Sequence, residues 1–186
     1  PAAPWAAPAP LHGAPLDEGR FGTPGLGGEA RPLRAAAVAC SSALPPYSPI
    51  PLPLTPQAVR ECAERKIGSI VLVAGGFAEV DHAGEDLQKE LESAARETGV
   101  RVLGPNTAGH ISTPSNFTSS FFPLGNIPRG GISYVAQTGN FTGAMMKHIM
   151  SAENYGVARC IGLGNTVDID ETDVFDFLAA DKHTKA

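Results

Sequence analysis

The sequence predicts an α/β protein with parallel sheets. From residue 55 onward, helix-like patterns with one apolar side alternate with short apolar runs that suit buried strands. The apolar runs end at glycine or small polar residues, as strands do where the chain turns. Because an order of helix, strand, helix, strand requires crossover connections, we expect parallel strands, arranged in two successive units.

Residues 1–54 differ in composition from the rest of the chain. They hold most of the 17 prolines, mixed with alanine and glycine, and this mixture resists regular structure. We therefore expect a largely irregular segment. The alanine-rich run within Arg34–Ser42 fits either one strand or one helical turn, and the sequence does not decide between them.

Residues 55–106 predict the first αβ unit. Thr55 is expected to cap a helix with Pro56 at its first position, and Gly68 is expected to stop it. The β-branched run Ser69–Ala74 suits a strand buried on both faces. After a glycine turn, residues 85–98 are amphipathic and end at a C-terminal glycine. Residues 100–103 then predict the next strand.

Residues 107–130 predict an ordered interdomain connection, because this polar stretch carries several phenylalanines that need packing. The second unit occupies residues 131–186. Its expected elements are a strand at 132–136, a helix at 140–152, a strand at 157–163 and a helix from about 171 to 180. The sequence stops where a further strand is expected, so we expect this unit to be truncated.

Composition excludes several classes of function. The chain has 186 residues, 42% of them hydrophobic, which is enough for one medium domain or parts of two. A net charge of −5 gives no basic footprint for nucleic acid. No apolar run is long enough to span a bilayer, and the N-terminus lacks a signal pattern. We expect a cytoplasmic protein without membrane partners.

Cysteines and histidines show no diagnostic spacing. The three cysteines Cys40, Cys62 and Cys160 are far apart, which favours reduced thiols over disulfides or a metal site. His148 lies about two helical turns from the start of its helix, too far to meet an anion bound there. His82 and His110 are expected in loops, and His183 lies near the end of the chain. We therefore nominate no catalytic histidine and no metal ligand.

The most informative stretch runs from Gly131 to Met150, where an apolar strand passes through Gln137, Thr138, Gly139 and Asn140 into a helix. The first N–H groups of a helix lack intrahelical partners and lie at the positive end of its dipole. We expect a phosphate-binding loop here. A plain N-cap by Thr138 is an equally good interpretation of the residues alone.

Two further loops follow the carboxyl ends of predicted strands, where ligands of open parallel sheets bind. At 73–77, glycines would let a ligand approach the backbone closely, although any tight turn also favours glycine. At 162–170, Asp168 and Asp170 lack the spacing of a calcium loop. We expect Asp170 or Thr172 to cap the helix that follows.

Four motifs in sequence order resemble the α-type part of the NDP-forming acyl-CoA synthetases, the superfamily of succinyl-CoA synthetase and ADP-forming acetyl-CoA synthetase. They are GGFAEV at 75–80, GVRVLGPNTAG at 99–109, ISYVAQTGNF at 132–141 and GLGNTVDIDETD at 162–173. The resemblance begins at Ile70 and covers about two-thirds of the chain. It implies the C-terminal half of a Rossmann-like CoA-binding domain, followed by the start of a flavodoxin-like ligase domain.

In that superfamily an acyl-CoA, phosphate and a nucleoside diphosphate give the acid, CoA and the triphosphate through a phosphohistidine. The resemblance implies that CoA contacts the loop formed by Val73, Ala74, Gly75, Gly76 and Phe77. It also implies that Gln137, Thr138, Gly139 and Asn140 steady the phosphoryl group. ATP or ADP with Mg would bind outside this chain, on an ATP-grasp subunit or domain.

The chain also departs from the superfamily pattern. Residues 1–54 show no glycine-rich CoA-phosphate loop, and the phosphohistidine belongs beyond Ala186. We therefore expect a fragment without catalytic residues of its own, inactive alone. A non-catalytic CoA-binding or regulatory module, as when such domains are fused to a protein acetyltransferase, is the alternative. A nicotinamide-dependent oxidoreductase is disfavoured because no Gly-x-Gly-x-x-Gly follows a strand.

Overall fold

The computed structural model describes residues 34–38 and 50–186, with gaps at 123–124 and 153–154. The elements in chain order are β1 Arg34–Val38, η1 Leu52–Leu54, α1 Thr55–Glu64, β2 Ile67–Leu72, α2 His82–Thr98, β3 Arg101–Leu103, β4 His110–Ser112, β5 Phe117–Thr118, β6 Arg129–Ala136, α3 Gly139–Ala152, β7 Val157–Gly162 and α4 Glu171–Ala180. The predicted α/β class is confirmed. Helix α4 has the predicted bounds.

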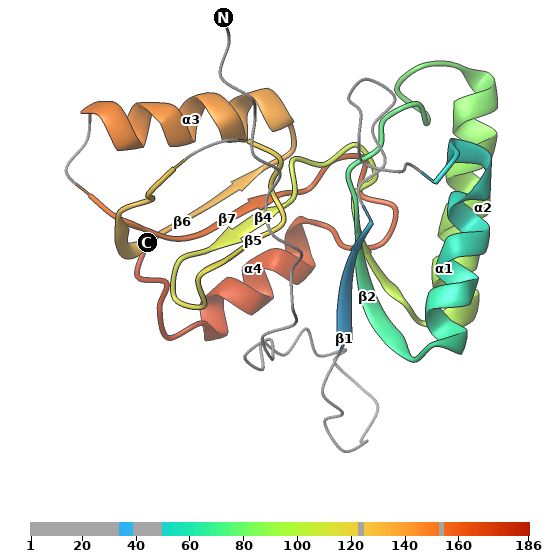
Figure 1. Cartoon of the computed structure of the whole chain (residues 1–186), viewed down its shortest axis with the longest axis horizontal. Coiled ribbons are helices and arrows are strands. Elements are labelled where there is room, and N and C mark those ends of the chain that lie inside the picture. Colours follow the sequence, from blue (N-terminus) through green and yellow to red (C-terminus); the bar gives the residue numbers. More distant parts are fainter. Residues whose placement is uncertain (1–33, 39–49, 123–124, 153–154) are drawn as a thin grey trace, which may run out of the picture.

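The first sheet is parallel and has the order β1–β2–β3. Helices α1 and α2 lie side by side against it (Figure 1). Their apolar sides bury Val59, Leu91 and Ala94 on the strand residues Leu72 and Val102. This cluster makes the core of the first unit, as the amphipathic pattern predicts.

The second sheet is mixed and has the order β5–β4–β7–β6. Strands β6 and β7 are parallel, as expected, whereas β4 runs antiparallel to β7 and to β5. Helices α3 and α4 lie on opposite sides of this sheet (Figure 1). On β7, Cys160 packs with the α3 side and its neighbour Ile161 with the α4 side, as strand alternation requires.

A third apolar cluster joins the two units. Val174 of α4 is fully buried with Leu163 and Ile169, and the same cluster includes Leu103 of β3 and, partly buried, Val71 of β2. The face of the first sheet away from α1 and α2 therefore packs on the second unit.

Several predicted helix ends are confirmed. Asp170 caps α4, with its carboxylate accepting from the N–H groups of Thr172 and Asp173, and Asp173 completes a capping box. Gly99 ends α2 in the left-handed conformation, with φ of 71°. The alanine-rich run left open between strand and helical turn is a strand over Arg34–Val38. Residues 1–33 and 39–49, including Cys40, lie outside the described residues.

Three predictions about the elements were wrong. Thr55 does not cap α1: its hydroxyl donates to the Leu52 carbonyl, and the residue is buried. Gly68 does not stop that helix, because α1 ends at Glu64 and Gly68 lies inside β2. The stretch expected only as a connection supplies β4 and β5, because its backbone pairs with β7, a partner distant in sequence.

Candidate functional site

The loops that follow β2, β3, β6 and β7 meet at one place between the two sheets. The Asn106 N–H donates to the Ala74 carbonyl at 2.7 Å, and the Asn165 N–H donates to the Pro105 carbonyl at 2.8 Å. The Gly164 N–H donates to the Gln137 carbonyl at 3.1 Å. These bonds connect the predicted CoA loop at 73–77 with the predicted phosphate loop at 137–140, although their sequences are 60 residues apart.

Gly164 makes this close approach feasible. A Cβ on residue 164 would lie 2.1 Å from the Pro105 carbonyl oxygen, and the φ of 71° already disfavours any side chain. Thr166, two residues later, also has a positive φ of 54°, which is uncommon for a β-branched residue. The 164–166 turn is therefore fixed against the loop that follows β3.

The predicted phosphate loop lies at the start of α3, which begins at Gly139. Gln137, Thr138 and Asn140 are exposed, and Gly139 is half-buried. A Cβ on Gly139 would lie 3.5 Å from the Cβ of Ala108, an ordinary van der Waals distance. The start of α3 is therefore accessible to an anion, as a phosphate-binding loop requires. Phosphate binding at this place stays a prediction.

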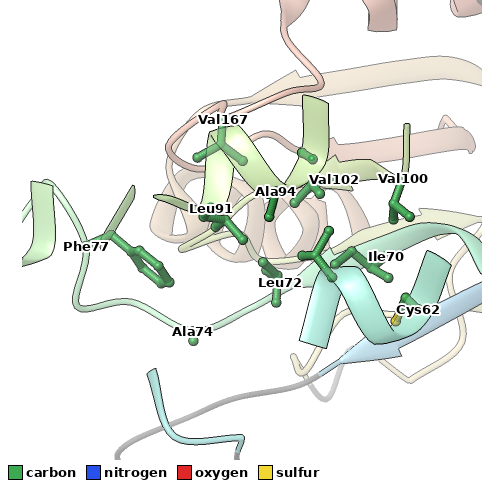
Figure 2. Packing of buried hydrophobic residues seen from close by; sticks show 12 residues of the cluster. Cys62, Ile70, Leu72, Ala74, Phe77, Leu91, Ala94, Val100, Val102 and Val167 are labelled. Carbon is green, nitrogen blue, oxygen red and sulfur yellow. The ribbon is translucent and has the colours of Figure 1, made fainter. Parts of the chain in front are cut away.

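The predicted CoA loop is less open than its glycines indicate. Val73 is half-buried, Ala74 is buried, and the Phe77 side chain is completely buried. Figure 2 shows the Phe77 ring directed toward the other members of the α1/α2 core cluster. Phe77 can therefore offer a ligand only its backbone, because its ring is a core residue.

The backbone amides of this loop hold a carboxylate of the same chain. The Gly76 N–H donates to Oε1 of Glu79 at 2.5 Å, and the Phe77 N–H donates to Oε2 at 3.2 Å. Burial acts to raise the pKa of the Glu79 carboxyl, but hydrogen bonds from Gly76 and Asn165 outweigh it, so the pKa lies below its usual value. Glu79 was not among the predicted site residues. The signal that could have found it is a glutamate three residues after a paired glycine, a spacing at which its side chain can fold back.

Asn165 connects that carboxylate to the second unit. Its Nδ2 donates to Oε2 of Glu79 at 2.6 Å and to Oε1 of Gln88 at 3.0 Å. Its Oδ1 accepts from Nδ2 of Asn106 at 3.4 Å. Polar side chains from four segments thus meet where the loops converge. From the sequence, Asn165 was placed in the 162–170 loop without a role of its own.

The acidic run after β7 is structural. Asp168 accepts from Nε of Arg101 at 2.9 Å and from the Val102 N–H at 2.7 Å, and Asp173 accepts from Nη2 of Arg101 at 2.8 Å. Arg101 therefore fastens this run to β3. Within the described ranges, no group of three His, Cys, Asp or Glu side chains could hold a metal ion.

The histidines among the described residues lie outside the converging loops. His110 is a β4 residue, not a loop residue as expected; it stacks on Phe117, and its Nδ1 lies 3.1 Å from Oγ of Ser119. Burial, with the nearby Arg159 charge, lowers its pKa to about 4. His82 begins α2 instead of lying in a loop, and His148 is exposed on α3. The free thiols of Cys62 and Cys160 are buried, and burial raises the pKa of Cys160 to about 12.

Comparison with known proteins confirms the predicted resemblance. Residues 129–186 match the family described as succinyl-CoA ligase like flavodoxin domain. Acetate–CoA ligase [ADP-forming] II of Archaeoglobus fulgidus is 35% identical over 137 residues, covering 73% of this chain and 20% of that protein. Acetate–CoA ligase [ADP-forming] I subunit alpha of Pyrococcus furiosus is 30% identical, covering 74% of this chain and 29% of the subunit.

A solved structure gives the same result. The dinucleotide forming acetyl-coenzyme A synthetase 1 of Candidatus Korarchaeum cryptofilum, in complex with phosphate and ADP, superposes with a TM-score of 0.70 at 27% identity. The match covers 81% of this chain and 30% of that one. The chain thus spans less than a third of the length of these relatives. No helix in the described part of the chain is long and apolar enough to cross a membrane.

Proposed function

We propose that the chain is a piece of an NDP-forming acyl-CoA synthetase, because residues 129–186 match the succinyl-CoA ligase like flavodoxin domain family and the chain is similar to ADP-forming acetate–CoA ligases. The proposed reaction of the whole enzyme converts acyl-CoA, ADP and phosphate into the carboxylic acid, CoA and ATP through a phosphohistidine. A partner ATP-grasp subunit or domain would bind ATP or ADP with Mg. We expect the enzyme to work in the cytoplasm and expect no turnover from this chain alone.

The observation that carries the proposal is the meeting of the 73–77 and 137–140 loops between the two sheets. An acyl-CoA synthetase must bring a thioester and phosphate together, because an oxygen of inorganic phosphate attacks the acyl carbon. The C–S bond of the thioester then breaks, and CoA leaves as the thiol. Two loops joined through Asn106, Gly164 and Asn165 can serve these two ligands at one location. The separation in sequence does not prevent this, since the loops share a network of backbone bonds.

The proposed role of the α3 start is to steady phosphate. Each interaction of an anion with a helix N-terminus contributes only about 0.3–1 kcal/mol at a surface, so several donors have to converge. The N–H groups of the first helical turn, with the side chains of Thr138 and Asn140, supply such a set. The proposed role of the 73–77 loop is to contact CoA through its backbone, since its largest side chain lies in the core.

Gly139→Ala tests the phosphate loop. Because the added Cβ meets only Ala108 at an ordinary distance, the melting temperature should stay close to that of wild type. A methyl group beside the amides should still hinder a bound anion and lower the affinity for inorganic phosphate severalfold. Equal phosphate affinity in both proteins, measured by calorimetry, would contradict the proposed site. Ser151→Ala, at the exposed C-terminal end of the same helix, is the control and should leave the phosphate affinity unchanged.

Calorimetry with CoA and with NAD tests the class of ligand. The proposal expects a saturable heat with CoA and none with NAD at the same concentrations. Binding of NAD without CoA would favour an oxidoreductase. Acid-labile phosphate on a histidine of the longer protein that contains this chain, formed with ATP, would separate the synthetase from a non-catalytic CoA-binding module.

A further inference from the structure

We propose that Glu79 and Asn165 are positioning residues that lock the 73–77 and 137–140 loops together, so that a change at one loop moves the other. We name the hydrogen bond between these two side chains the Glu79–Asn165 latch. Its structural part stands on the described contacts alone. Its consequence for ligand binding rests on the proposed function.

One end of the latch controls the 73–77 loop. The two oxygens of Glu79 accept from the amides of Gly76 and Phe77, and hydrogen bonds to a charged acceptor are about twice as strong as neutral ones. The carboxylate replaces the anion that such paired amides would otherwise attract. The conformation of this loop therefore depends on where the Glu79 side chain is held.

The other end of the latch fixes that position from the second unit. Asn165 donates to Glu79 at 2.6 Å, while its own backbone is bound to the Pro105 carbonyl. The preceding residue, Gly164, holds the carbonyl of Gln137. A side-chain contact at Glu79 is thus separated from the phosphate loop by only two adjacent residues of one turn.

The turn itself is suited to pass on a displacement. Gly164 packs closely against Pro105, because a Cβ at this position would lie only 2.1 Å from the Pro105 carbonyl oxygen. Thr166 is held in the left-handed region at φ 54°, and such strained residues persist only where their surroundings fix them. Because the 164–166 turn is held on both sides, it should move as one body. A shift of the Asn165 side chain should then displace Gly164 and the Gln137 carbonyl to which the Gly164 N–H donates.

The first test needs no ligand. In the full chain, Glu79→Ala should change the NMR amide signals of Gly76 and Phe77 and also that of Thr138, whose peptide group carries the Gln137 carbonyl. Asn165→Ala should change the same three signals. The controls Asp86→Asn, on the exposed side of α2, and Asn126→Ala, in the loop before β6, should leave Thr138 unchanged. A Thr138 signal that is the same in Glu79→Ala and wild type overturns the latch.

Rescue separates positioning from general damage to the fold. Glu79→Gln keeps the chain length and one acceptor oxygen, so its Thr138 signal should lie between those of wild type and Glu79→Ala. The double variant Glu79→Ala/Asn165→Ala should shift Thr138 no further than either single variant, because each single change already opens the latch. Additive shifts would show that the two residues act independently and would overturn the proposal.

The ligand arm uses CoA with and without inorganic phosphate. If the latch couples the loops, phosphate should change CoA affinity about fivefold or more in wild type, the low end of measured coupling between sites. That effect should disappear in Asn165→Ala. If the wild-type chain does not bind CoA, the proposed function is wrong, but the ligand-free NMR result still tests the latch. An equal effect of phosphate on CoA affinity in wild type and in Asn165→Ala would contradict the latch.

Discussion

Removing the Asp168 carboxylate should destabilise the chain by about 2–4 kcal/mol, because this group holds two donors at the junction of the units. Hydrogen bonds to charged groups contribute about 1.5–3 kcal/mol each, and Asp168 accepts from Arg101 and from the Val102 amide. The Arg101 side chain is only 15% exposed and that of Asp168 26%. Because the Asp168–Arg101 pair is only partly exposed, removing the carboxylate should cost more than the about 0–1 kcal/mol that an exposed ion pair contributes. It should cost less than the about 3–5 kcal/mol lost when one partner of a fully buried pair is removed.

Urea unfolding followed by circular dichroism measures this loss. Asp168→Ala leaves the amide of the fully buried Val102 without its acceptor, whereas Asp168→Asn keeps one oxygen for it and should cost about half as much. Asp176→Ala on the exposed side of α4 is the control for loss of a negative charge. An Asp168→Ala free energy of unfolding within about 0.5 kcal/mol of wild type, the range of neutral surface changes, would refute this reasoning.

Two further changes have a defined direction. Burial would raise the pKa of Asp181, but hydrogen bonds from Arg159 and other donors outweigh it and lower the pKa to about 2. Because the carboxyl has a lower pKa in the folded than in the unfolded chain, its charged form stabilises the fold at pH values above the unfolded-state pKa of about 4. Asp181→Asn should therefore be less stable than wild type at pH 7, and this difference should vanish as the pH falls from about 4 toward 2. Thermal melts across that pH window check it, and a pH-independent difference would contradict it. Gly164→Ala should lower the free energy of unfolding by more than about 2 kcal/mol, because its Cβ would clash with Pro105. Gly99→Ala, which has no atom within 4 Å of its Cβ, should lower it by about 1 kcal/mol. Equal losses for the two variants in urea unfolding would contradict the predicted clash.

Local signals in the sequence predicted the regular elements well. Helix α4 and its Asp170 cap follow from a carboxylate placed just before an apolar helical pattern, which is a short-range interaction. The left-handed Gly99 follows for the same reason. The start of α3 was also placed within one residue. Each of these features is decided by residues within one or two helical turns.

The misses depend on partners distant in sequence. Strand β4 exists because β7, more than 40 residues later, offers it an antiparallel edge, and no local pattern in a polar segment announces that. Thr55 has the right residue type for a cap, but the short helix before α1 presents the Leu52 carbonyl to its hydroxyl. The burial of the Phe77 ring was not predicted either, because it depends on α2 and on Leu72 across the core.

The candidate site shows the same division. The two loops were predicted from strand ends and glycines, and the structure brings them together. Glu79 and Asn165 were missed because their interaction spans 86 positions, and a glutamate in a turn is ordinarily a solvated charge.

The apolar cluster around Val174 has a consequence for how the molecule melts. Leu103 and Val71 of the first unit share that cluster with Leu163 and Ile169 of the second. Neither unit can therefore unfold without exposing apolar side chains of the other to water. Heating should therefore produce a single calorimetric transition for both halves. A version cut between β3 and β4 should bind apolar dyes and be digested quickly by proteases.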